Sequence, residues 1–314
     1  MNKAVADLPL AICLMGPTAS GKTALAVELV QRGPFEIISV DSALVYRGMD
    51  IGTAKPGPDV LAMAPHRLVD ICDPTEAYSA ARFREDALVA MDEIVAKGNT
   101  PLLVGGTMLY FRALERGLSE MPAADPAVRA RLDQELQQRG SQYLHARLAH
   151  IDSISAARIH PNDPQRVQRA LEVYELTGKT LTEHWQQANQ AQSLPFCLKK
   201  FAVIPPDRLA LRDRAAARFQ QMLDAGFVAE VEALRARAGM SVDLASMRAV
   251  GYRQVWQYLD EHCDYDEMKS LAITATCQLA KRQLTWLRSD NDLECLGGNS
   301  RDNLETLCRG LGLH

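Results

Sequence analysis

The chain has 314 residues, 47% of them hydrophobic and 24% charged, which is typical of a globular protein large enough to bury a core. Its formal net charge of -4 excludes nucleic-acid binding through overall positive charge and leaves a local basic surface open. The seven cysteines form no Cys-x-x-Cys pair, so zinc-ligand spacing is absent and we expect reduced thiols in a cytoplasmic protein. The apolar runs are too short to span a bilayer, so we expect no membrane partner.

The first third of the chain alternates short apolar runs with helical patterns. Residues 10–15, 35–40 and 101–104 are predicted to be buried strands, and residues 23–30 and 80–97 are predicted to be helices. Strands separated by helices indicate right-handed βαβ units and a parallel sheet. Ligands of such sheets bind outside the carboxyl ends of the strands, so we search there for functional residues.

A glycine-rich loop follows the first predicted strand. Its sequence, Gly-Pro-Thr-Ala-Ser-Gly-Lys-Thr, matches the P-loop pattern G-x-x-x-x-G-K-[ST] between a strand and a helix. Backbone N–H groups and the helix N-terminus would bind phosphate oxygens, Lys22 would contact the terminal phosphates, and the Thr23 hydroxyl would ligate Mg²⁺. ATPases, GTPases, kinases and some transferases share this motif, although no guanine-reading Asn-Lys-x-Asp stretch is present. The predicted diphosphate-binding residues are Gly16, Pro17, Thr18, Ala19, Ser20, Gly21, Lys22 and Thr23.

Two further polar residues follow predicted strands. Asp41 comes directly after residues 35–40, and Thr107 follows the third strand and a Gly-Gly pair. In a parallel sheet both would lie at the same edge as the phosphate loop. Asp41 fits either a cap of the next turn or a catalytic carboxylate, and Thr107 fits either a helix N-cap or a hydrogen-bonding group in the site.

The sequence pattern changes near residue 117. Residues 122–148 have a helical pattern, and a further strand is predicted only at residues 201–204. The predicted fold class is therefore α/β, with a P-loop NTPase-like parallel sheet core that is flanked by helices and carries an α-helical insertion domain. We assign residues 1–117 and 199–314 to the catalytic core and residues 118–198 to the insertion.

Several longer strings are more specific than the loop motif. They are Ile-Ser-Val-Asp-Ser-Ala at 38–43, Met-Asp-Ile-Gly-Thr-Ala-Lys-Pro at 49–56, Val-Gly-Gly-Thr-Met-Leu-Tyr at 104–110, and the segments 158–166, 250–254 and 280–288. Together with the P-loop, these strings resemble the bacterial-type tRNA dimethylallyltransferase family. The resemblance extends from about Leu8 to Arg288, and the remaining residues 289–314 carry no pattern that we can interpret.

The resemblance implies transfer of a dimethylallyl group from dimethylallyl diphosphate to N6 of adenosine 37 in tRNAs that read codons beginning with U, with release of diphosphate. It implies catalytic roles for Asp41, as the general base, and for Thr107. It also implies an arginine from the later core, and we prefer Arg214 over Arg218, which is four residues further along the same helix face. We expect Mg²⁺ as cofactor and a monomeric protein, and leave open whether the loop also binds ATP.

Surfaces for tRNA are also expected, because the target base must be extruded from its loop and flanking bases must be held. The insertion would grip the anticodon stem, and Tyr252 between Arg248 and Arg253 would stack on a base. Residues 269–288 contain basic but no acidic side chains, so they fit either an RNA surface or a solvated face. The predicted tRNA-binding residues are Asp41, Ser42, Ala43, Leu44, Thr107, Arg129, Gln165, Arg166, Val167, Gln168, Arg169, Arg248, Gly251, Tyr252, Arg253, Lys281 and Arg282.

Two other functions fit the same motifs. A P-loop kinase of a small metabolite would use ATP at the loop and would be indifferent to tRNA. An RNA-binding protein whose nucleotide loop only gates binding would retain its RNA affinity without Asp41.

Overall fold

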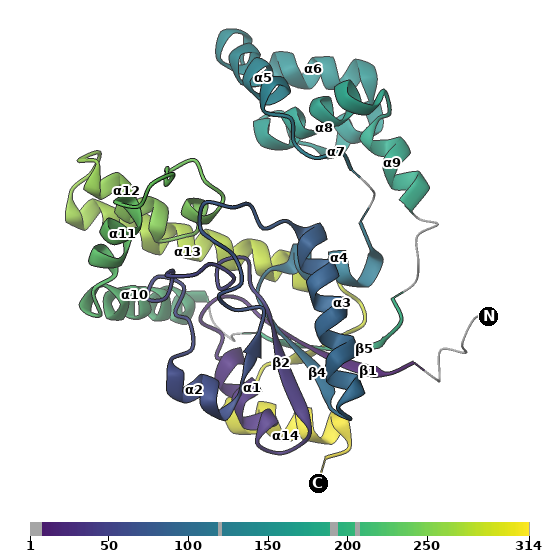
Figure 1. Ribbon diagram of the computed structural model, residues 1–314, viewed down its shortest axis with the longest axis vertical. Helices are drawn as coiled ribbons and strands as arrows, with labels where there is room; N and C mark the ends of the chain where they lie inside the picture. Colours follow the sequence, from purple (N-terminus) through teal and green to yellow (C-terminus); the bar gives the residue numbers. More distant parts are fainter. Residues whose placement is uncertain (1–7, 119–120, 189–193, 205–207, 314) are drawn as a thin grey trace. The chain divides into compact units, whose positions relative to one another are not determined.

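A six-stranded parallel sheet organises the protein, in the order β3-β2-β4-β1-β5-β6 (Figure 1). The computed structural model describes residues 8–118, 121–188, 194–204 and 208–313. The strands are β1 (Leu10–Met15), β2 (Phe35–Val40), β3 (His66–Arg67), β4 (Thr100–Gly105), β5 (Cys197–Val203) and β6 (Leu293–Leu296). The predicted parallel α/β sheet is confirmed, and β3 and β6 are edge strands that the sequence analysis did not predict.

Both faces of the sheet are covered by helices, which explains why its central strands are almost entirely apolar. Ile12 and Leu14 of β1 point to a cluster with α1 (Lys22–Val30) and α14 (Ser300–Leu311). The alternate residues of β1 point to a larger cluster on the other face. That cluster includes side chains from α3 (Ala80–Ala96), α4 (Met108–Arg116) and α13 (Tyr265–Arg288).

The remaining helices of this part of the chain are α2 (Pro58–Met63), α10 (Arg208–Asp224), α11 (Phe227–Arg235), a 3₁₀ turn (Ser246–Arg248) and α12 (Tyr252–Leu259). Phe227, Tyr252 and Met268 are fully buried where α11, α12 and α13 pack together. The same cluster includes Met49 from the loop after β2, so these helices pack on a loop that begins at the edge of the sheet.

The chain divides into two compact units, residues 1–115 with 194–314 and residues 116–193. The sequence analysis placed these divisions at 117/118 and 198/199. The second unit consists of α5 (Pro126–Arg139), α6 (Ser141–Ile151), α7 (Ser153–Arg158), α8 (Pro164–Thr177) and α9 (Leu181–Ala188), around its own apolar core. The single helical pattern at 122–148 is two helices, because Gly140 adopts a φ of 79° between them.

The C-terminal segment, for which the sequence analysis made no prediction, forms β6 and α14. Asn299 caps α14 by accepting a hydrogen bond from the Asp302 N–H, and Leu304 and Leu307 bury its apolar face. Among the described residues, no helix has the length and apolar character needed to cross a membrane.

Candidate functional site

The adjacent strands β2, β4 and β1 end in register, so their carboxyl ends lie side by side at one end of the sheet. Val40 of β2 pairs with Gly105 of β4, which also pairs with Met15 of β1. A Cβ atom on Gly105 would lie 2.0 Å from the Val40 carbonyl oxygen, so only glycine allows this approach. The residues that follow the three strands therefore start side by side, and the predicted convergence of the P-loop, Asp41 and Thr107 is confirmed.

The phosphate loop turns tightly between β1 and α1. Gly21 and Ala19 adopt positive φ angles of 87° and 64°, and the Ser20 N–H donates to the Pro17 carbonyl at 3.2 Å. The Lys22 ammonium donates to the same carbonyl at 3.3 Å. The Ser20 hydroxyl is buried and has no hydrogen-bond partner among the described residues, which fits a loop whose ligand supplies the missing partner.

Lys22 lies in an electrostatic environment that disfavours its own charge. The pKa of Lys22 is lowered to about 8: burial is the main cause, the Asp41 carboxylate opposes the shift, and the Arg218 guanidinium adds to it. The pKa of Arg218 is also lowered by burial and raised by Asp41. Two cations and one carboxylate are therefore electrostatically coupled in a partly desolvated place, where a polyanionic ligand would be bound strongly.

Asp41 and Thr107 are joined through the turn that follows β2. The Asp41 Oδ1 atom accepts hydrogen bonds from the N–H groups of Ala43 and Leu44, at 2.9 and 3.4 Å. The Thr107 hydroxyl accepts one from the Ser42 N–H at 3.0 Å. Asp41 thus caps its turn with one oxygen, and within the described residues its Oδ2 accepts no hydrogen bond. The capping and catalytic interpretations of Asp41 are therefore compatible.

A buried glutamine, which the sequence analysis did not single out, connects two sides of this site. Gln283 of α13 accepts a hydrogen bond from the Thr18 N–H at 3.0 Å and donates one to the Gly106 carbonyl at 2.8 Å. A Cβ atom on Gly106 would lie 2.6 Å from the Gln283 amide nitrogen. Gln283 lies within segment 280–288, one of those that carry the family resemblance. Its position there was the only indication in the sequence that it could have a role in the site.

Arg218 and Arg214 differ in their environments although both lie on α10. Arg218 is half-buried and donates to the Thr53 carbonyl at 3.3 Å. Arg214, one turn earlier, is exposed. The electrostatic coupling with Lys22 and Asp41 places Arg218 at the phosphate-binding edge of the sheet.

The predicted tRNA-binding residues of the first unit differ in their exposure. Arg248, Arg253, Lys281 and Arg282 all present their side chains to solvent. Tyr252 is completely buried, and its hydroxyl donates to Glu230 at 2.5 Å. The predicted stacking of this ring on a base is therefore wrong, because the aromatic face is already packed inside the protein.

Gly251, which precedes Tyr252, is also buried, and its N–H donates to the Gln254 side chain at 2.8 Å. It caps α12 rather than offering a surface. Ser42, Ala43 and Leu44 form the turn that hydrogen-bonds to Asp41 and Thr107, and their contact with tRNA stays a prediction.

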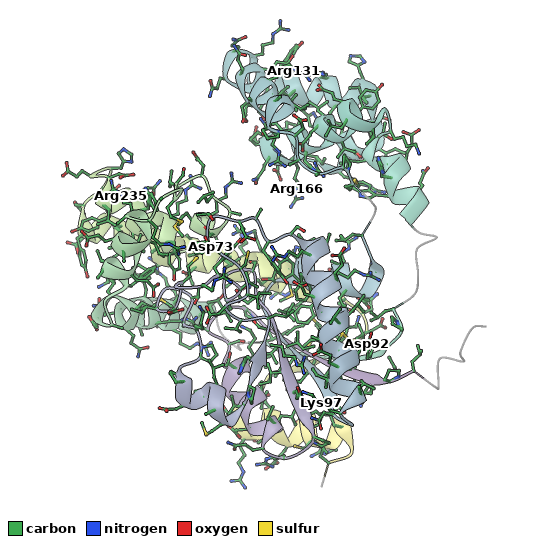
Figure 2. All side chains as sticks on the ribbon, in the orientation of Figure 1. Asp73, Asp92, Lys97, Arg131, Arg166 and Arg235 are labelled. Carbon is green, nitrogen blue, oxygen red and sulfur yellow. The ribbon has the colours of Figure 1, made fainter. Side chains whose placement is uncertain are left out.

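In the helical unit, α8 carries both exposed and buried members of the predicted set. Gln165 and Arg166 are exposed at its start, as Figure 2 shows for Arg166, which also pairs with Asp163 at 3.2 Å. Gln168 donates to Asp133 at 2.6 Å. Val167 is fully buried in the core of the unit, so a side-chain contact between Val167 and RNA is excluded, and a contact through its backbone stays a prediction.

The two remaining arginines of the set, Arg129 and Arg169, share the buried carboxylate of Glu172 at 2.9 and 2.6 Å. Burial raises the pKa of Glu172, but the hydrogen bonds from Arg169 and Arg129 outweigh it, so the net shift of the pKa is downward. These arginines therefore stabilise the unit internally, whether or not they also contact RNA.

The residues at the loop fit a phosphate-bound Mg²⁺ rather than a protein-enclosed metal. The described residues contain no group of three or more His, Cys, Asp or Glu side chains that could hold a metal ion. Thr23 is exposed at the start of α1, where its hydroxyl could be one ligand of a cation that otherwise binds phosphate oxygens and water.

The parallel sheet and the P-loop after β1 define the class to which this molecule belongs, the proteins with a P-loop NTPase-like fold. The sequence model of the IPP transferase family matches residues 44–290. The chain therefore belongs to the IPP transferase family. It is similar to the tRNA dimethylallyltransferase of Thioalkalivibrio sulfidiphilus (strain HL-EbGR7), with 63% identity over 301 residues, which cover 96% of this chain and 94% of that protein.

Solved structures of related proteins have the same fold. The full-length tRNA isopentenylpyrophosphate transferase of Bacillus halodurans superposes with a TM-score of 0.70 at 35% identity, over 98% of this chain and 96% of its own. The corresponding protein of Staphylococcus epidermidis gives 0.69 at 30% identity, over 97% and 99%. A eukaryotic dimethylallyltransferase that acts on tRNA gives 0.77 at 25% identity, over 96% of this chain and 78% of its own.

Proposed function

We propose that this protein transfers the dimethylallyl group of dimethylallyl diphosphate to N6 of adenosine 37 in tRNAs that read codons beginning with U, and releases diphosphate. The observation that carries the proposal is that Lys22 of the phosphate loop, Asp41 after β2 and Arg218 of α10 are close enough to influence one another electrostatically. Such a site provides cations for a leaving diphosphate and a carboxylate for the proton of an attacking amine. The tRNA dimethylallyltransferase at 63% identity supports this choice of reaction.

The phosphate loop would act on the leaving group. As the C1–O bond of the donor breaks, its electron pair passes to the diphosphate, whose negative charge increases. The loop N–H groups, Lys22 and Arg218 are arranged to stabilise that charge, and such electrostatic stabilisation is commonly the largest catalytic contribution. The half-buried position of Arg218 leads us to assign it, rather than Arg214, as the arginine that contacts the diphosphate.

Asp41 would act on the acceptor. The N6 lone pair forms the new bond to C1, and the nitrogen must lose a proton to become the neutral secondary amine. The Oδ2 oxygen of Asp41 would accept that proton, while Oδ1 holds the turn. A positioned base of this kind contributes about 10²–10⁴ in rate. The Thr107 hydroxyl accepts from the Ser42 N–H at 3.0 Å and donates to the Ser42 hydroxyl at 3.4 Å, so it would hold the turn beside Asp41.

Mg²⁺ fits the exposed Thr23 hydroxyl together with the phosphate oxygens of the donor. When bound, it would neutralise part of the diphosphate charge. The protein residues would still determine where the donor lies and where the proton goes.

The direct test is to incubate the protein with Mg²⁺, unmodified tRNA and radiolabelled dimethylallyl diphosphate. We expect label at adenosine 37. The Asp41→Asn variant keeps an oxygen that can cap the turn but cannot accept the proton, so its single-turnover rate on bound tRNA should fall by about 10²–10⁴. Binding of tRNA should be retained.

Three results would contradict the proposal. Consumption of the ATP γ-phosphate without label in tRNA would identify a kinase. RNA binding without any transfer would identify a binding protein. An Asp41→Asn rate equal to wild type would leave Asp41 with only its capping role.

A further inference from the structure

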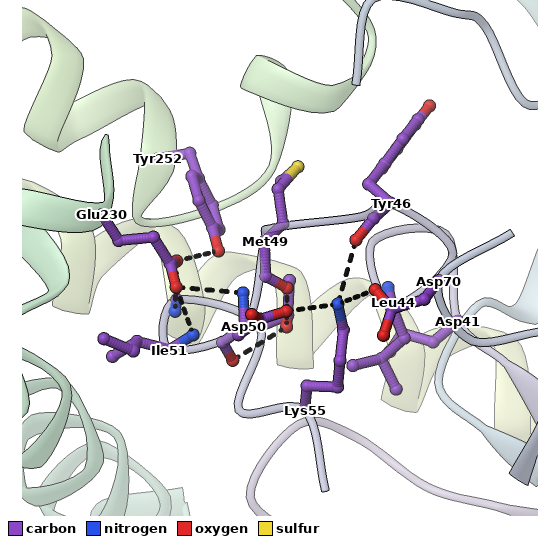
Figure 3. Close-up of polar contacts among 12 residues, drawn as sticks. Asp41, Leu44, Tyr46, Met49, Asp50, Ile51, Lys55, Asp70, Glu230 and Tyr252 are labelled. Atoms are coloured by element: carbon purple, nitrogen blue, oxygen red, sulfur yellow. Dashed lines mark hydrogen bonds and ion pairs between the residues drawn. The ribbon is translucent and has the colours of Figure 1, made fainter. Parts of the chain in front are cut away.

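The loop between β2 and α2 is held by a carboxylate from a distant helix. Glu230 of α11 accepts hydrogen bonds from three consecutive backbone N–H groups, those of Asp50, Ile51 and Gly52, at 3.0, 2.7 and 3.1 Å (Figure 3). The Tyr252 hydroxyl donates to the same carboxylate at 2.5 Å. Successive N–H groups that converge on one anion form a strong, directional site, so this side chain fixes the backbone of the loop.

Aromatic packing holds the same loop from another direction. A Cβ atom on Gly52 would lie 2.0 Å from the Phe227 ring and 2.6 Å from the Tyr252 ring. Phe227 meets the Tyr252 ring edge-to-face at 4.9 Å and the Phe219 ring at 6.1 Å. The loop backbone therefore lies directly on these rings, and Phe219 is the neighbour of Arg218 on α10.

The far end of the loop is fixed by a buried lysine. The Lys55 ammonium donates to the Tyr46 carbonyl at 3.0 Å and pairs with the Asp50 and Asp70 carboxylates. With Glu230 at one end and Lys55 at the other, the residues between them have little freedom. Thr53 lies in this interval, and its carbonyl accepts the hydrogen bond from Arg218 at 3.3 Å.

We propose that Glu230 is a positioning residue for the transfer reaction: by fixing residues 50–53, it places the Thr53 carbonyl that orients the Arg218 guanidinium toward the diphosphate. The inference rests on the proposed function, because it concerns the arginine assigned there to the donor. Glu230 itself lies on α11 and acts through the loop rather than on substrate. Removal of its charge leaves three N–H groups facing a weaker partner, and the loop and Arg218 then lose their fixed positions.

The test compares Glu230→Gln with Glu232→Gln, an exposed glutamate on the same helix. In the Gln variant the side-chain NH₂ faces N–H donors, so the three hydrogen bonds to the loop cannot all form. Because displacement of a positioned group by about 1 Å can cost about 10²-fold, we expect kcat/KM for dimethylallyl diphosphate to fall by about 10- to 100-fold. The KM for tRNA should change little, and the Glu232→Gln variant should match wild type.

A double-mutant cycle with Arg218→Ala separates positioning from general stability. If Glu230 acts through Arg218, the Glu230→Gln substitution should have almost no further effect on kcat/KM in the Arg218→Ala background. Independent, multiplicative effects would overturn the inference. So would a Glu230→Gln variant with wild-type kinetics, in a preparation whose wild-type enzyme transfers label; a wild-type enzyme without transfer would instead contradict the proposed function.

If Glu230→Gln does not fold, as judged by its thermal unfolding, Glu230→Asp replaces it in the same cycle. This variant keeps the charge and retracts the carboxylate by one methylene. We expect a smaller loss of kcat/KM that is again absent with Arg218→Ala. A loss of equal size in both backgrounds would overturn the inference.

Discussion

Lys22 is held in a place where its positive charge is disfavoured until an anion arrives. Burial is the main cause, the Asp41 carboxylate offsets only part of it, and Arg218 adds repulsion. A bound diphosphate reverses this balance, because it brings negative charge to both cations. The electrostatic contribution to the binding free energy is therefore largest for a highly charged ligand.

The lowered pKa of Lys22 predicts how the affinity for inorganic diphosphate depends on pH. The ligand favours the protonated amine, whose pKa in the free protein is about 8, so the affinity is limited above that pH by the growing fraction of neutral Lys22. We expect Kd to rise by up to about tenfold per pH unit there, as measured by isothermal titration calorimetry.

Lys22→Arg is the matched control, because the guanidinium stays charged throughout this range. Its Kd should not show the additional rise above about pH 8, and any titration of diphosphate itself cancels in the comparison. If the two proteins show the same pH dependence, Lys22 is not the group responsible.

The pH dependence of folding stability has the opposite direction. The unfolded state holds the Lys22 proton more tightly, so the destabilisation caused by burying the charge is fully present below about pH 8. It disappears as the pH rises toward the ordinary pKa of lysine.

At the scale of elements, α13 contributes the residue that closes the site from behind. Gln283 connects the Thr18 N–H of the phosphate loop to the Gly106 carbonyl after β4. Substitution by Met keeps the size of the side chain and removes both hydrogen bonds. The Gly106 carbonyl then keeps only its hydrogen bond from the Met108 N–H at 3.1 Å, so we expect a loss of about 0.5–1.5 kcal/mol, to which the partly exposed Thr18 N–H adds less.

Urea unfolding should therefore give a lower free energy for Gln283→Met than for Gln278→Met, an exposed substitution in the same helix. The KM for dimethylallyl diphosphate should also rise in the first variant and not in the second. Equal stabilities would mean that the Gln283 hydrogen bonds contribute nothing measurable.

Local sequence patterns predicted the elements that bind phosphate and failed where the role of a residue depends on distant packing. The bounds of β1 and β2 were predicted correctly, because each is a short apolar run followed by a turn or a polar residue. The two-residue strand β3 offers no such run. Gly140 interrupts the helix through its positive φ. This conformation has no effect on hydrophobic periodicity, so the sequence pattern did not reveal the break.

The site was predictable to a similar extent. Asp41 and Thr107 could be found because both follow strands of one sheet. Gln283 lies 265 positions from its partner in the phosphate loop, and Glu230 lies about 180 positions from its own partners, so no local pattern joins them. Tyr252 was misassigned because a tyrosine between arginines suggests RNA stacking, and the local sequence does not reveal that the ring is buried.

At the scale of the whole molecule, each unit has its own core and its own predicted contribution. The first unit contains the phosphate loop and Asp41, and the second carries the exposed side chains of Gln165 and Arg166 at the start of α8. Donor binding and tRNA binding should therefore respond separately to substitutions.

Arg166→Ala tests that separation. Arg166 is largely exposed and makes one surface ion pair, which contributes little to stability. If it contacts a phosphate of the tRNA, its loss should weaken tRNA binding and reduce the slope of log K against log salt by about 1, with KM for the donor unchanged. Filter-binding titrations at several salt concentrations would measure this.

Arg131→Ala is the control, because Arg131 is also exposed on the helical unit (Figure 2). Like Arg166 it makes an ion pair, in its case with Glu175. It lies outside the predicted tRNA-binding set. Identical salt slopes for both variants would show that the start of α8 has no particular role in tRNA binding.

The pairing of β1 with β5 has a consequence for how the chain is made. Leu10 of β1 lies opposite Cys197 of β5, and the whole helical unit is encoded between them. A ribosome that adds about 5–20 residues per second needs roughly 4–16 s to synthesise the intervening unit of about 80 residues. During that time β1 has an unpaired edge, which is a template for aggregation. The α-helical unit, with its short-range contacts, can fold in that interval, and the sheet that carries the phosphate loop is completed only after it.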